Sequence, residues 1–493
     1  EVEKSARSLL LFASLVYGLA LGVHHVTILL TFPAIFVLVY LTVGKEYIFS
    51  KRLLLLFVAL FIGLSIYIYL PFAASRETII NWGNPKTFAN FYDHISGKQY
   101  QVNLFSSGMD KVSEELSQFL RIIFQEFTLV GLLVGLFGFF AVWQKEKRLF
   151  WFVTLIIFFD LAYSFNYDIA EDKDAYYLIT HFAFTLVIAV GARYMLDVAS
   201  RKNGLVLLSL LVLLLLLPCL NFYTHYFRNN RSNYTIAYDY VKNSLSSIEE
   251  GGLLLTADWQ MYSPYLYMRH LENFRKDATV IDTNLLRRSW YVEIYLKREY
   301  PEMMKACANE VEAYMKDLRL FEQDLPYDIP AINRNYFAMV EAFIKFHTPK
   351  HSAHITLPID DGVGRNYTWV PQGLTMLLSS SKEFIPSYPN IDLKSISDSS
   401  QYIDQVAEEK VVPRYSMMFI NRGRYLNLHN KNDEALKFIE LAIRLEPERD
   451  AAYEALGDVY TAMGNQTEAL KAYRNALEIN PNNREVIKKL QRQ

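Results

Sequence analysis

The sequence of 493 residues contains only two cysteines, Cys219 in an apolar run and Cys307 much further along the chain. Two cysteines in such different surroundings exclude a disulfide framework and a thiolate metal site. The formal net charge is −2, which gives no general attraction to nucleic acid. Glycine-rich loops that hold nucleotide phosphates are also missing. We therefore predict no metal site and no cofactor, and we do not expect nucleic acid as a partner.

Long apolar runs fill the first 221 residues. Seven of them come close to the roughly 17–25 residues that cross a bilayer. They are 7–23, 26–43, 53–72, 127–143, 149–165, 176–195 and 204–220. Basic residues gather in every second short loop, at positions 4–7, 45–52, 145–148 and 193–202. Because basic loops of membrane proteins lie on the cytoplasmic side, the C-terminal half is predicted to be extracytoplasmic.

This pattern predicts an integral membrane protein, with a bacterial inner membrane as the expected location. Residues 1–221 would form a polytopic α-helical domain with outer loops over 73–126 and 166–175. The chain begins at Glu1, without Met or a signal-peptide pattern, and enters an apolar run directly. We therefore expect it to be a fragment that lacks an N-terminal part.

Three segments on the predicted outer side could build a site. The first is the turn His24-His25, where two imidazoles could hold a phosphate, although a cap at the membrane interface is the commoner role. The second is the loop that begins Asn81-Trp82-Gly83-Asn84-Pro85. Its amides and aromatic rings suit a sugar, although Thr87–His94 could equally be an amphipathic helix lying on the membrane. The residues predicted to bind a substrate are His24, His25, Arg76, Asn81, Trp82, Asn84, Lys98, Tyr100 and Gln101.

The third segment is the acidic turn 166–175, which carries four carboxylates within seven residues. A carboxylate here could act as a general base or bind a metal ion, and a solvated loop is the equally good alternative. Asp168, Asp172 and Asp174 are the candidates for catalysis. The spans themselves hold almost no charge apart from Asp160, which argues against a transporter.

After the last span the sequence is typical of soluble protein. A predicted helix over 234–247 is followed by the strand 253–257, a helix, the strand 278–282 and another helix. This order indicates an α/β domain with parallel strands, which we place at 222–410. Ligands of such sheets bind at the carboxyl ends of the strands, where Asp258-Trp259-Gln260 and Asp282-Thr283-Asn284 lie. Further strands are predicted at 354–357 and 373–379.

Residues 411–493 contain a repeat of 34 residues. Aromatic, glycine, alanine and proline positions recur at this spacing; they are Phe419/Tyr453, Gly423/Gly457, Ala435/Ala469, Ala442/Ala476 and Pro447/Pro481. The pattern resembles the tetratricopeptide repeat, an α-helical unit that commonly binds peptides. Two copies are few for a stable array, so we expect them to lean on the preceding domain, with a capping helix after Asn482.

Taken together, the chain resembles the bacterial membrane proteins grouped as domain of unknown function 2723. The resemblance rests on segments from both halves: 18–25, 81–85, 96–101, 171–177, 256–258, 285–291 and 369–374. That family is similar to the GT-C class of glycosyltransferases, and its eukaryotic relative is a protein O-mannosyltransferase of the secretory pathway. The resemblance implies transfer of a sugar from a polyprenyl-phosphate carrier to an acceptor on the outer side.

In the GT-C class an acidic residue on the first outer loop deprotonates the acceptor hydroxyl. The family carries it in a Gly-Asp-Ser/Cys-Gly-Glu type of motif near the N-terminus, and this sequence has none. The resemblance therefore implies a catalytic base upstream of Glu1, or an inactive chain.

Two functions are carried forward. The first is a membrane glycosyltransferase with a polyprenyl-phosphate sugar as donor and a protein as the expected acceptor. The alternative is a non-enzymatic scaffold, whose α/β domain and tetratricopeptide repeats bind partner proteins beside the bilayer. A transporter ranks third. The sequence leaves the sugar, the acceptor and the oligomeric state open.

Overall fold

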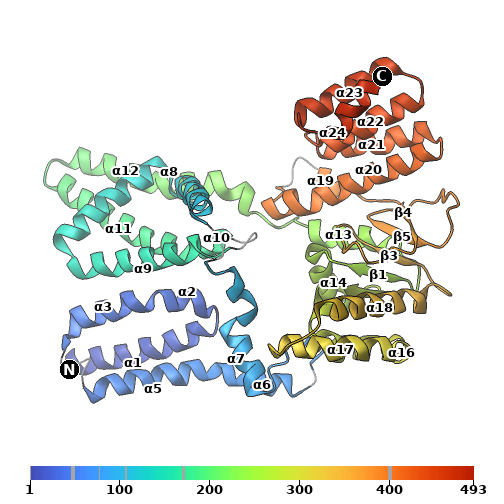
Figure 1. Cartoon of the computed structure of the whole chain (residues 1–493). Helices are drawn as coiled ribbons and strands as arrows, with labels where there is room; N and C mark the ends of the chain where they lie inside the picture. Colours follow the sequence, from blue (N-terminus) through green and yellow to red (C-terminus); the bar gives the residue numbers. More distant parts are fainter. Residues whose placement is uncertain are drawn as a thin grey trace. The chain divides into compact units, whose positions relative to one another are not determined.

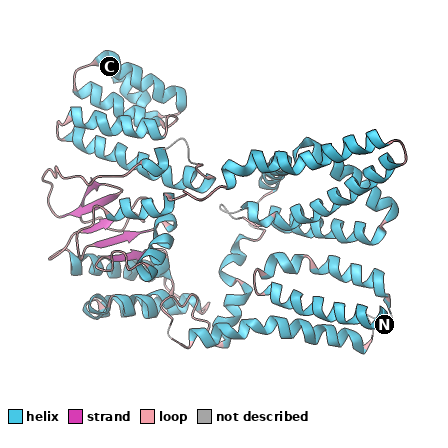
Figure 2. Ribbon diagram, turned by 180° about the vertical axis from the view of Figure 1, so that it is seen from behind, coloured by secondary structure: helices cyan, strands magenta, loops and turns pink. Residues whose placement is uncertain are grey.

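The computed structural model describes residues 2–45, 50–76, 78–105, 108–168, 173–397 and 402–492. The chain forms two compact units, Glu1–Asn229 and Asn230–Gln493. The first unit is built from helices, whereas the second combines helices with one sheet (Figures 1 and 2). Each unit is described by itself.

The first unit contains long apolar helices and the shorter elements that join them. Its helices are α1 (Val2–Leu21), α2 (His25–Leu30), α3 (Phe32–Val43), α5 (Lys51–Leu64), α6 (Tyr69–Ala74), α7 (Phe88–Ser96), α8 (Met109–Lys145), α9 (Lys147–Phe165), α10 (Lys173–Tyr176), α11 (Leu178–Ser200) and α12 (Gly204–Asn229). Two 3₁₀ segments, η1 (Ser65–Ile68) and η2 (Lys98–Asn103), complete it.

Six helical segments of the described chain are long and apolar enough to cross a membrane. They are His25–Val43, Lys51–Ala74, Asp110–Lys145, Lys147–Phe165, Leu178–Ser200 and Gly204–Asn229. All seven predicted runs lie on helices, and the first run corresponds to the shorter apolar helix Ser8–Leu21. Helix α8 begins well before the predicted run at 127, and it bends at Thr128, whose φ is +58°. Its first half is therefore a charged helix within the predicted outer loop.

Glycines allow the membrane helices to approach closely. A Cβ at Gly18 of α1 would lie 2.1 Å from the Leu60 carbonyl oxygen of α5, and one at Gly138 of α8 would lie 2.1 Å from that of Val187 on α11. Small residues are typical of membrane helix contacts, because dispersion forces and backbone approach hold such helices together. Ser14 of α1 also donates to the Leu56 carbonyl of α5.

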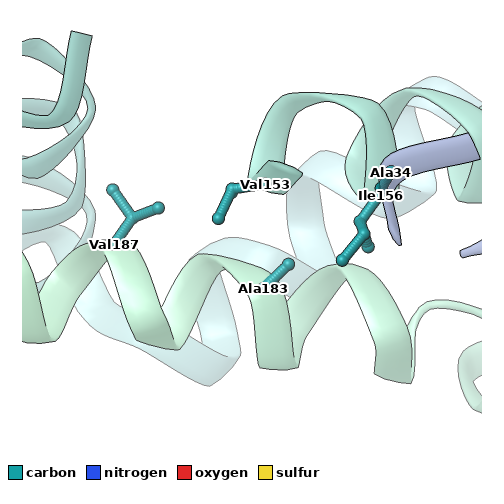
Figure 3. Packing of buried hydrophobic residues seen from close by; sticks show 5 residues of the cluster. All are labelled: Ala34, Val153, Ile156, Ala183 and Val187. Atoms are coloured by element: carbon teal, nitrogen blue, oxygen red, sulfur yellow. The ribbon is translucent and has the colours of Figure 1, made fainter. Parts of the chain in front are cut away.

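The helix directions agree with a chain that alternates between two ends of the unit. Ser14 contacts Leu56, and Tyr67, beyond the end of α5, donates to the Leu21 carbonyl, so α1 and α5 run parallel. Asp160 of α9 contacts Thr180 of α11, while an apolar cluster lies further along the same pair (Figure 3). That cluster consists of Ala34, Val153, Ile156, Ala183 and Val187. The first residues of α1 and of α5 therefore lie at the same end of the unit.

The second unit has a five-stranded mixed sheet with helices around it. Its strands are β1 (Leu253–Thr256), β2 (Thr279–Asp282), β3 (Ala353–Ile355), β4 (Thr368–Gln372) and β5 (Thr375–Ser379), in the order β2-β1-β3-β5-β4. Its helices before the last strands are α13 (Ile236–Leu245), α14 (Trp259–Leu271), α15 (Lys297–Glu299), α16 (Pro301–Ala306), α17 (Ala308–Glu322) and α18 (Ile329–His347). The turns η3 (Leu285–Arg287) and η4 (Tyr291–Leu296) lie between α14 and α15.

The predicted parallel core is confirmed, and the sheet also has an antiparallel part. Strand β1 pairs in parallel with β2 and β3, whereas β5 is antiparallel to β3 and β4. Only Gly373 and Leu374 separate β4 from β5, and so short a connection can join antiparallel strands alone. Gly373 has a φ of +57°, which favours glycine at this turn. Strand β4 was not predicted.

The C-terminal segments are α19 (Lys394–Ser397), η5 (Ala407–Val411), α20 (Val412–Leu428), α21 (Asn432–Leu445), α22 (Asp450–Ala462), α23 (Gln466–Ile479) and α24 (Arg484–Arg492). Helix α20 packs with α21, and α22 packs with α23, as antiparallel pairs that the 34-residue period predicts. Gly423 and Gly457 lie against Ile439 and Tyr473 of the following helices, where a Cβ would clash. Helix α24 covers the last pair, so the predicted capping helix is confirmed.

Arg422 joins this array to the sheet. Its side chain is 1% exposed, and it donates to the carbonyls of Pro371 on β4 (3.2 Å) and Pro386 (3.0 Å). The guanidinium lies between the rings of Tyr388 and Tyr425, at 5.0 and 5.3 Å. The repeat helices therefore rest on the α/β part, and α20 lies along the edge strand β4 (Figure 1).

We expect Arg422→Met to lower the free energy of unfolding of the second unit by about 3 kcal/mol, because buried carbonyls lose their donor. The measurement is thermal or denaturant unfolding of the full chain, monitored by a signal that comes from the second unit. Arg444→Met, at an exposed position on α21, is the matched control and should change stability by less than about 0.5 kcal/mol. Equal, small effects of both substitutions would contradict the assigned role of Arg422.

Candidate functional site

A short antiparallel contact joins the two outer loops of the first unit. Leu104 pairs with Tyr167, the Phe105 amide donates to the Asn166 carbonyl (2.7 Å), and the Asp168 amide donates to that of Asn103 (2.8 Å). These residues come from the predicted loops 73–126 and 166–175. The structure therefore brings two of the three predicted outer segments together.

The third segment meets them through aromatic rings. The ring of His24 lies edge-on to Tyr176, with 5.8 Å between centroids, and 6.4 Å from the ring of His25. Tyr176 in turn contacts Tyr167 at 5.4 Å, and Tyr167 stacks on Tyr163 at 5.3 Å. His24 also caps α2, since its Nδ1 accepts from the Thr27 amide.

We call His24, His25, Tyr163, Tyr167 and Tyr176 the outer cluster. Burial raises the pKa of Tyr176, and the hydroxyls of Tyr167 and Tyr163 raise it further. Tyr100 also acts on this pKa, and its exposed side chain belongs to the preceding outer loop. The cluster thus combines imidazoles and neutral phenols, which can donate hydrogen bonds to an anion or a sugar.

Ion pairs surround the outer cluster. Lys111 of α8 pairs with Asp168, and Arg228 of α12 lies 3.8 Å from Asp174. Deeper, Lys173 pairs with Glu115 at 3.4 Å and donates to the Tyr167 carbonyl at 2.6 Å. Burial lowers the pKa of Lys173, and the charge of Glu115 opposes that effect. Both partners of this pair are almost completely buried, so it fixes the acidic turn on α8.

Several predicted substrate-binding residues instead shape their own loop. Asn81 is buried, and its Nδ2 donates to the Ala74 carbonyl (3.4 Å) and to Asn84 Oδ1 (3.1 Å). The Asn84 carbonyl accepts from Asn90 of α7 at 3.0 Å. Thr87 caps α7, and Gly97 ends it in a left-handed conformation. The amphipathic helix that we gave as the alternative for this stretch is therefore present, and Phe88 and Tyr92 on it are exposed.

The remaining predicted residues show local contacts. The Arg76 guanidinium lies 4.3 Å from the ring of Phe72, Lys98 is 3.7 Å from Asp93, and Gln101 donates to the Ser96 carbonyl. Trp82 has an interaction within the described chain. Asp172 lies outside the described residues. Of the predicted site residues, the structure thus brings His24, His25 and Asp168 to one place.

Sequence reasoning missed the residues that hold the acidic turn, namely Lys111, Glu115 and the tyrosines at 163 and 167. The spacing of Lys111, Glu115 and Phe119, four residues apart, places them on one helical face and could have indicated this contact. The prediction of a loop over residues 73–126 leaves this periodicity out.

At the sheet of the second unit, the polar residues of the strand ends are engaged with one another. Asp258 accepts from the Gln260 amide as the cap of α14, from the Tyr240 hydroxyl (2.6 Å) and from Arg414 of α20 (3.3 Å). Asp282 accepts from the Leu285 amide at 2.8 Å. Both carboxylates are buried, and their contacts stabilise the fold. A ligand site at this edge stays a prediction.

The C-terminal helices carry a charged inner face. Lys489 of α24 lies 2.7 Å from both Glu454 and Asp458 of α22, and Arg424 of α20 lies 3.6 Å from Glu454. Helices α20, α22 and α24 are the first members of successive pairs. The pairing, the period and the small residues between the helices identify the repeat. Residues 451–483 match the family model of the tetratricopeptide repeat.

The tetratricopeptide repeat match confirms that part of the sequence interpretation. These repeats commonly mediate contacts between proteins, which fits the expectation of a partner protein. No curated protein matches the chain, and no solved structure does. The resemblance of the chain to the domain of unknown function stays an interpretation of its motifs.

Asp282 makes the stability of the second unit depend on pH. Burial raises its pKa from 3.8 to about 6. A carboxyl with a raised pKa in the folded state stabilises the fold below the pKa of the unfolded state, and this contribution is lost as pH rises through about 6. We expect Asp282→Asn to gain up to about 3 kcal/mol relative to wild type between about pH 4 and pH 7. The measurement is unfolding at both pH values. Asp277→Asn is the control, because Arg275 lowers the pKa of Asp277, and an identical pH trend in both variants would contradict the assignment.

Proposed function

We propose that the protein is a membrane glycosyltransferase that uses a sugar linked to a polyprenyl phosphate. The observation that carries this proposal is the outer cluster, in which His24 meets Tyr176 beside the acidic turn although the two residues are far apart in the sequence. The cluster lies where helices long enough to span a membrane end. A donor that is anchored in the bilayer would reach such a position from the side.

The charges suit the leaving group of this reaction. Negative charge develops on the carrier phosphate as the sugar departs, and positioned donors lower the barrier for that step. His24 and His25 are the donors we assign first. Arg76 and Lys98, which the sequence also indicated, are assigned second, because each has a local contact elsewhere in the loop.

The acceptor and the sugar would lie against the loop 73–126. Tyr100 and Tyr92 present exposed rings of the kind that pack on a sugar face. The general base is assigned among the carboxylates of the acidic turn: Asp168, Asp172 and Asp174. Asp168 directly follows Tyr167 of the outer cluster, and Asp174 lies two residues before Tyr176.

The same proposal places the second unit on the outer side of a bacterial inner membrane, where its tetratricopeptide repeats bind the acceptor protein or a partner. The observation that favours the alternative function, a non-enzymatic scaffold, is the tetratricopeptide repeat match itself. A compact second unit is common to both proposals.

We expect His24→Ala, His25→Ala, Asp168→Asn and Asp172→Asn each to reduce sugar transfer by roughly 10²-fold, the usual effect of removing a catalytic donor or base. Trp82→Ala, which removes a ring predicted to bind the sugar, should also reduce transfer. Membranes with the full-length gene product receive polyprenyl-phosphate sugars, and intact mass of outer-surface proteins reports transfer. Asp433→Asn, at an exposed position of α21, is the control and should leave transfer unchanged.

Full transfer in all five variants would refute the assigned site. Transfer by no donor, together with capture of one partner by residues 230–493 alone as well as by the full chain, would support the scaffold instead. In that case substitution of Arg424 and Lys489 on the inner face should weaken capture, and Arg444→Ala should not.

A further inference from the structure

Asp160 is a fully buried acid inside a membrane-spanning helix. It lies on α9, about 8 Å before the helix end at Phe165, and its side chain is 0% exposed. Its Oδ2 accepts two hydrogen bonds from Thr180 of α11, from the amide (3.1 Å) and from the hydroxyl (2.6 Å). Its Oδ1 has no hydrogen-bond partner among the described residues.

Among the described residues, no cationic side chain forms an ion pair with Asp160. The elements packed against α9 are α2, α3, α8, α10 and α11. Their ionisable groups nearest to it are Glu115 of α8, Lys173 of α10, and Tyr177 and His181 at the start of α11; α2 and α3 add only His25 and Tyr40. Lys173 already pairs with Glu115, which also accepts from the Tyr177 hydroxyl. An unpaired carboxylate buried among membrane helices would therefore be strongly destabilising.

A neutral carboxyl group on Asp160 explains why Oδ2 accepts two hydrogen bonds and Oδ1 accepts none. Oδ2 would be the carbonyl oxygen, which accepts from Thr180, and Oδ1 would carry the proton. Ser164 lies one helical turn further on the same face of α9 and is also buried, and its Oγ likewise has no partner in the part of the chain that the structure describes. A hydroxyl oxygen can accept the hydrogen bond that the Oδ1 proton offers through a buried water.

We propose that Asp160 and Ser164 form a proton-binding site between α9 and α11, in which Asp160 is held in its protonated form. The ligand of this site is a proton, and the residues that bind it are not members of the outer cluster. The proposal does not depend on the proposed transferase activity. The proposal gives a role to Asp160, the acidic residue within the predicted spans. With Asp160 protonated, its hydrogen bonds with Thr180 join two uncharged groups.

The first test is infrared spectroscopy of the full chain in lipid vesicles at neutral pH. We expect the difference between wild type and Asp160→Asn to contain the C=O band of a protonated carboxylic acid. The expected difference for Asp168→Asn, whose carboxylate pairs with Lys111, contains carboxylate bands instead. Carboxylate bands in the Asp160→Asn difference would overturn the proposal.

Ser164→Ala tests the assigned acceptor. Loss of this hydrogen bond should shift the carboxylic acid band of Asp160 to higher frequency, and Ser200→Ala, at the far end of α11, should leave it in place. An unchanged band in Ser164→Ala would refute Ser164 as the partner.

A chemical test detects the protonated carboxyl in the wild-type chain. An apolar carbodiimide reacts with a protonated carboxyl: the acid proton moves to one nitrogen, the carboxyl oxygen bonds to the central carbon, and the acyl group then shifts to nitrogen. The product is a stable adduct that contains every atom of both reactants. We expect peptide mass analysis to find the adduct on Asp160 and its loss in Asp160→Asn, with Glu115 unmodified because Lys173 pairs with it. Modification of Glu115 without Asp160 would contradict the proposal.

Discussion

Backbone contact between membrane helices at glycine positions is the constraint on which the first unit depends. At Gly18, Gly63 and Gly138 an added Cβ would lie within 2.3 Å of a carbonyl oxygen on the facing helix. Such close pairs fix the offset of one helix against another, because neither side chain nor water fits between them. The offset of α1 against α5 and of α8 against α11 in turn determines which residues meet where the helices end.

The polar contacts follow from that packing. Because α8 lies along α11, Glu115 reaches Tyr177 and Lys173, and their pairing holds the acidic turn in place. The turn then pairs with residues 103–105 of the preceding outer loop and presents Tyr176 to His24. The outer cluster is therefore a consequence of how the spans pack. In the second unit Arg422 has the corresponding role, since it attaches the repeat helices to the edge of the sheet.

Much of the fold could be predicted from the sequence because the patterns involved are local. Apolar length predicted the helices of the first unit, and the 34-residue period predicted the pairing of α20 to α23 and the cap α24. Parallel strands β1 and β2 followed from their spacing with a helix between them. The helical start of α8 and the strand β4 were missed, since a charged amphipathic helix and a short edge strand that contains Pro371 are weakly distinguished from loop.

The site was less predictable, because it depends on contacts between distant segments. Composition indicated His24, Tyr100 and Asp168, yet it could not separate them from Asn81 and Asn84, whose amides are used by their own loop. Lys111, Glu115 and Tyr167 matter only once α8, the acidic turn and the loop are in contact. The unpartnered oxygens of Asp160 and Ser164 also become meaningful only when the packing of α9 against α11 is known.

The central claim is that the outer loop and the repeats lie on one side of the membrane and the connection between α8 and α9 lies on the other. The most direct test is cysteine accessibility from the two sides of the membrane. Single cysteines replace Tyr100 in the outer loop, Glu146 between α8 and α9, and Asp433 in the repeats, in a chain with Cys219→Ser and Cys307→Ser. A thiol reagent that cannot cross membranes should modify positions 100 and 433 in intact spheroplasts and position 146 only after lysis. Modification of position 146 from outside, or of positions 100 and 433 from opposite sides, would contradict the account.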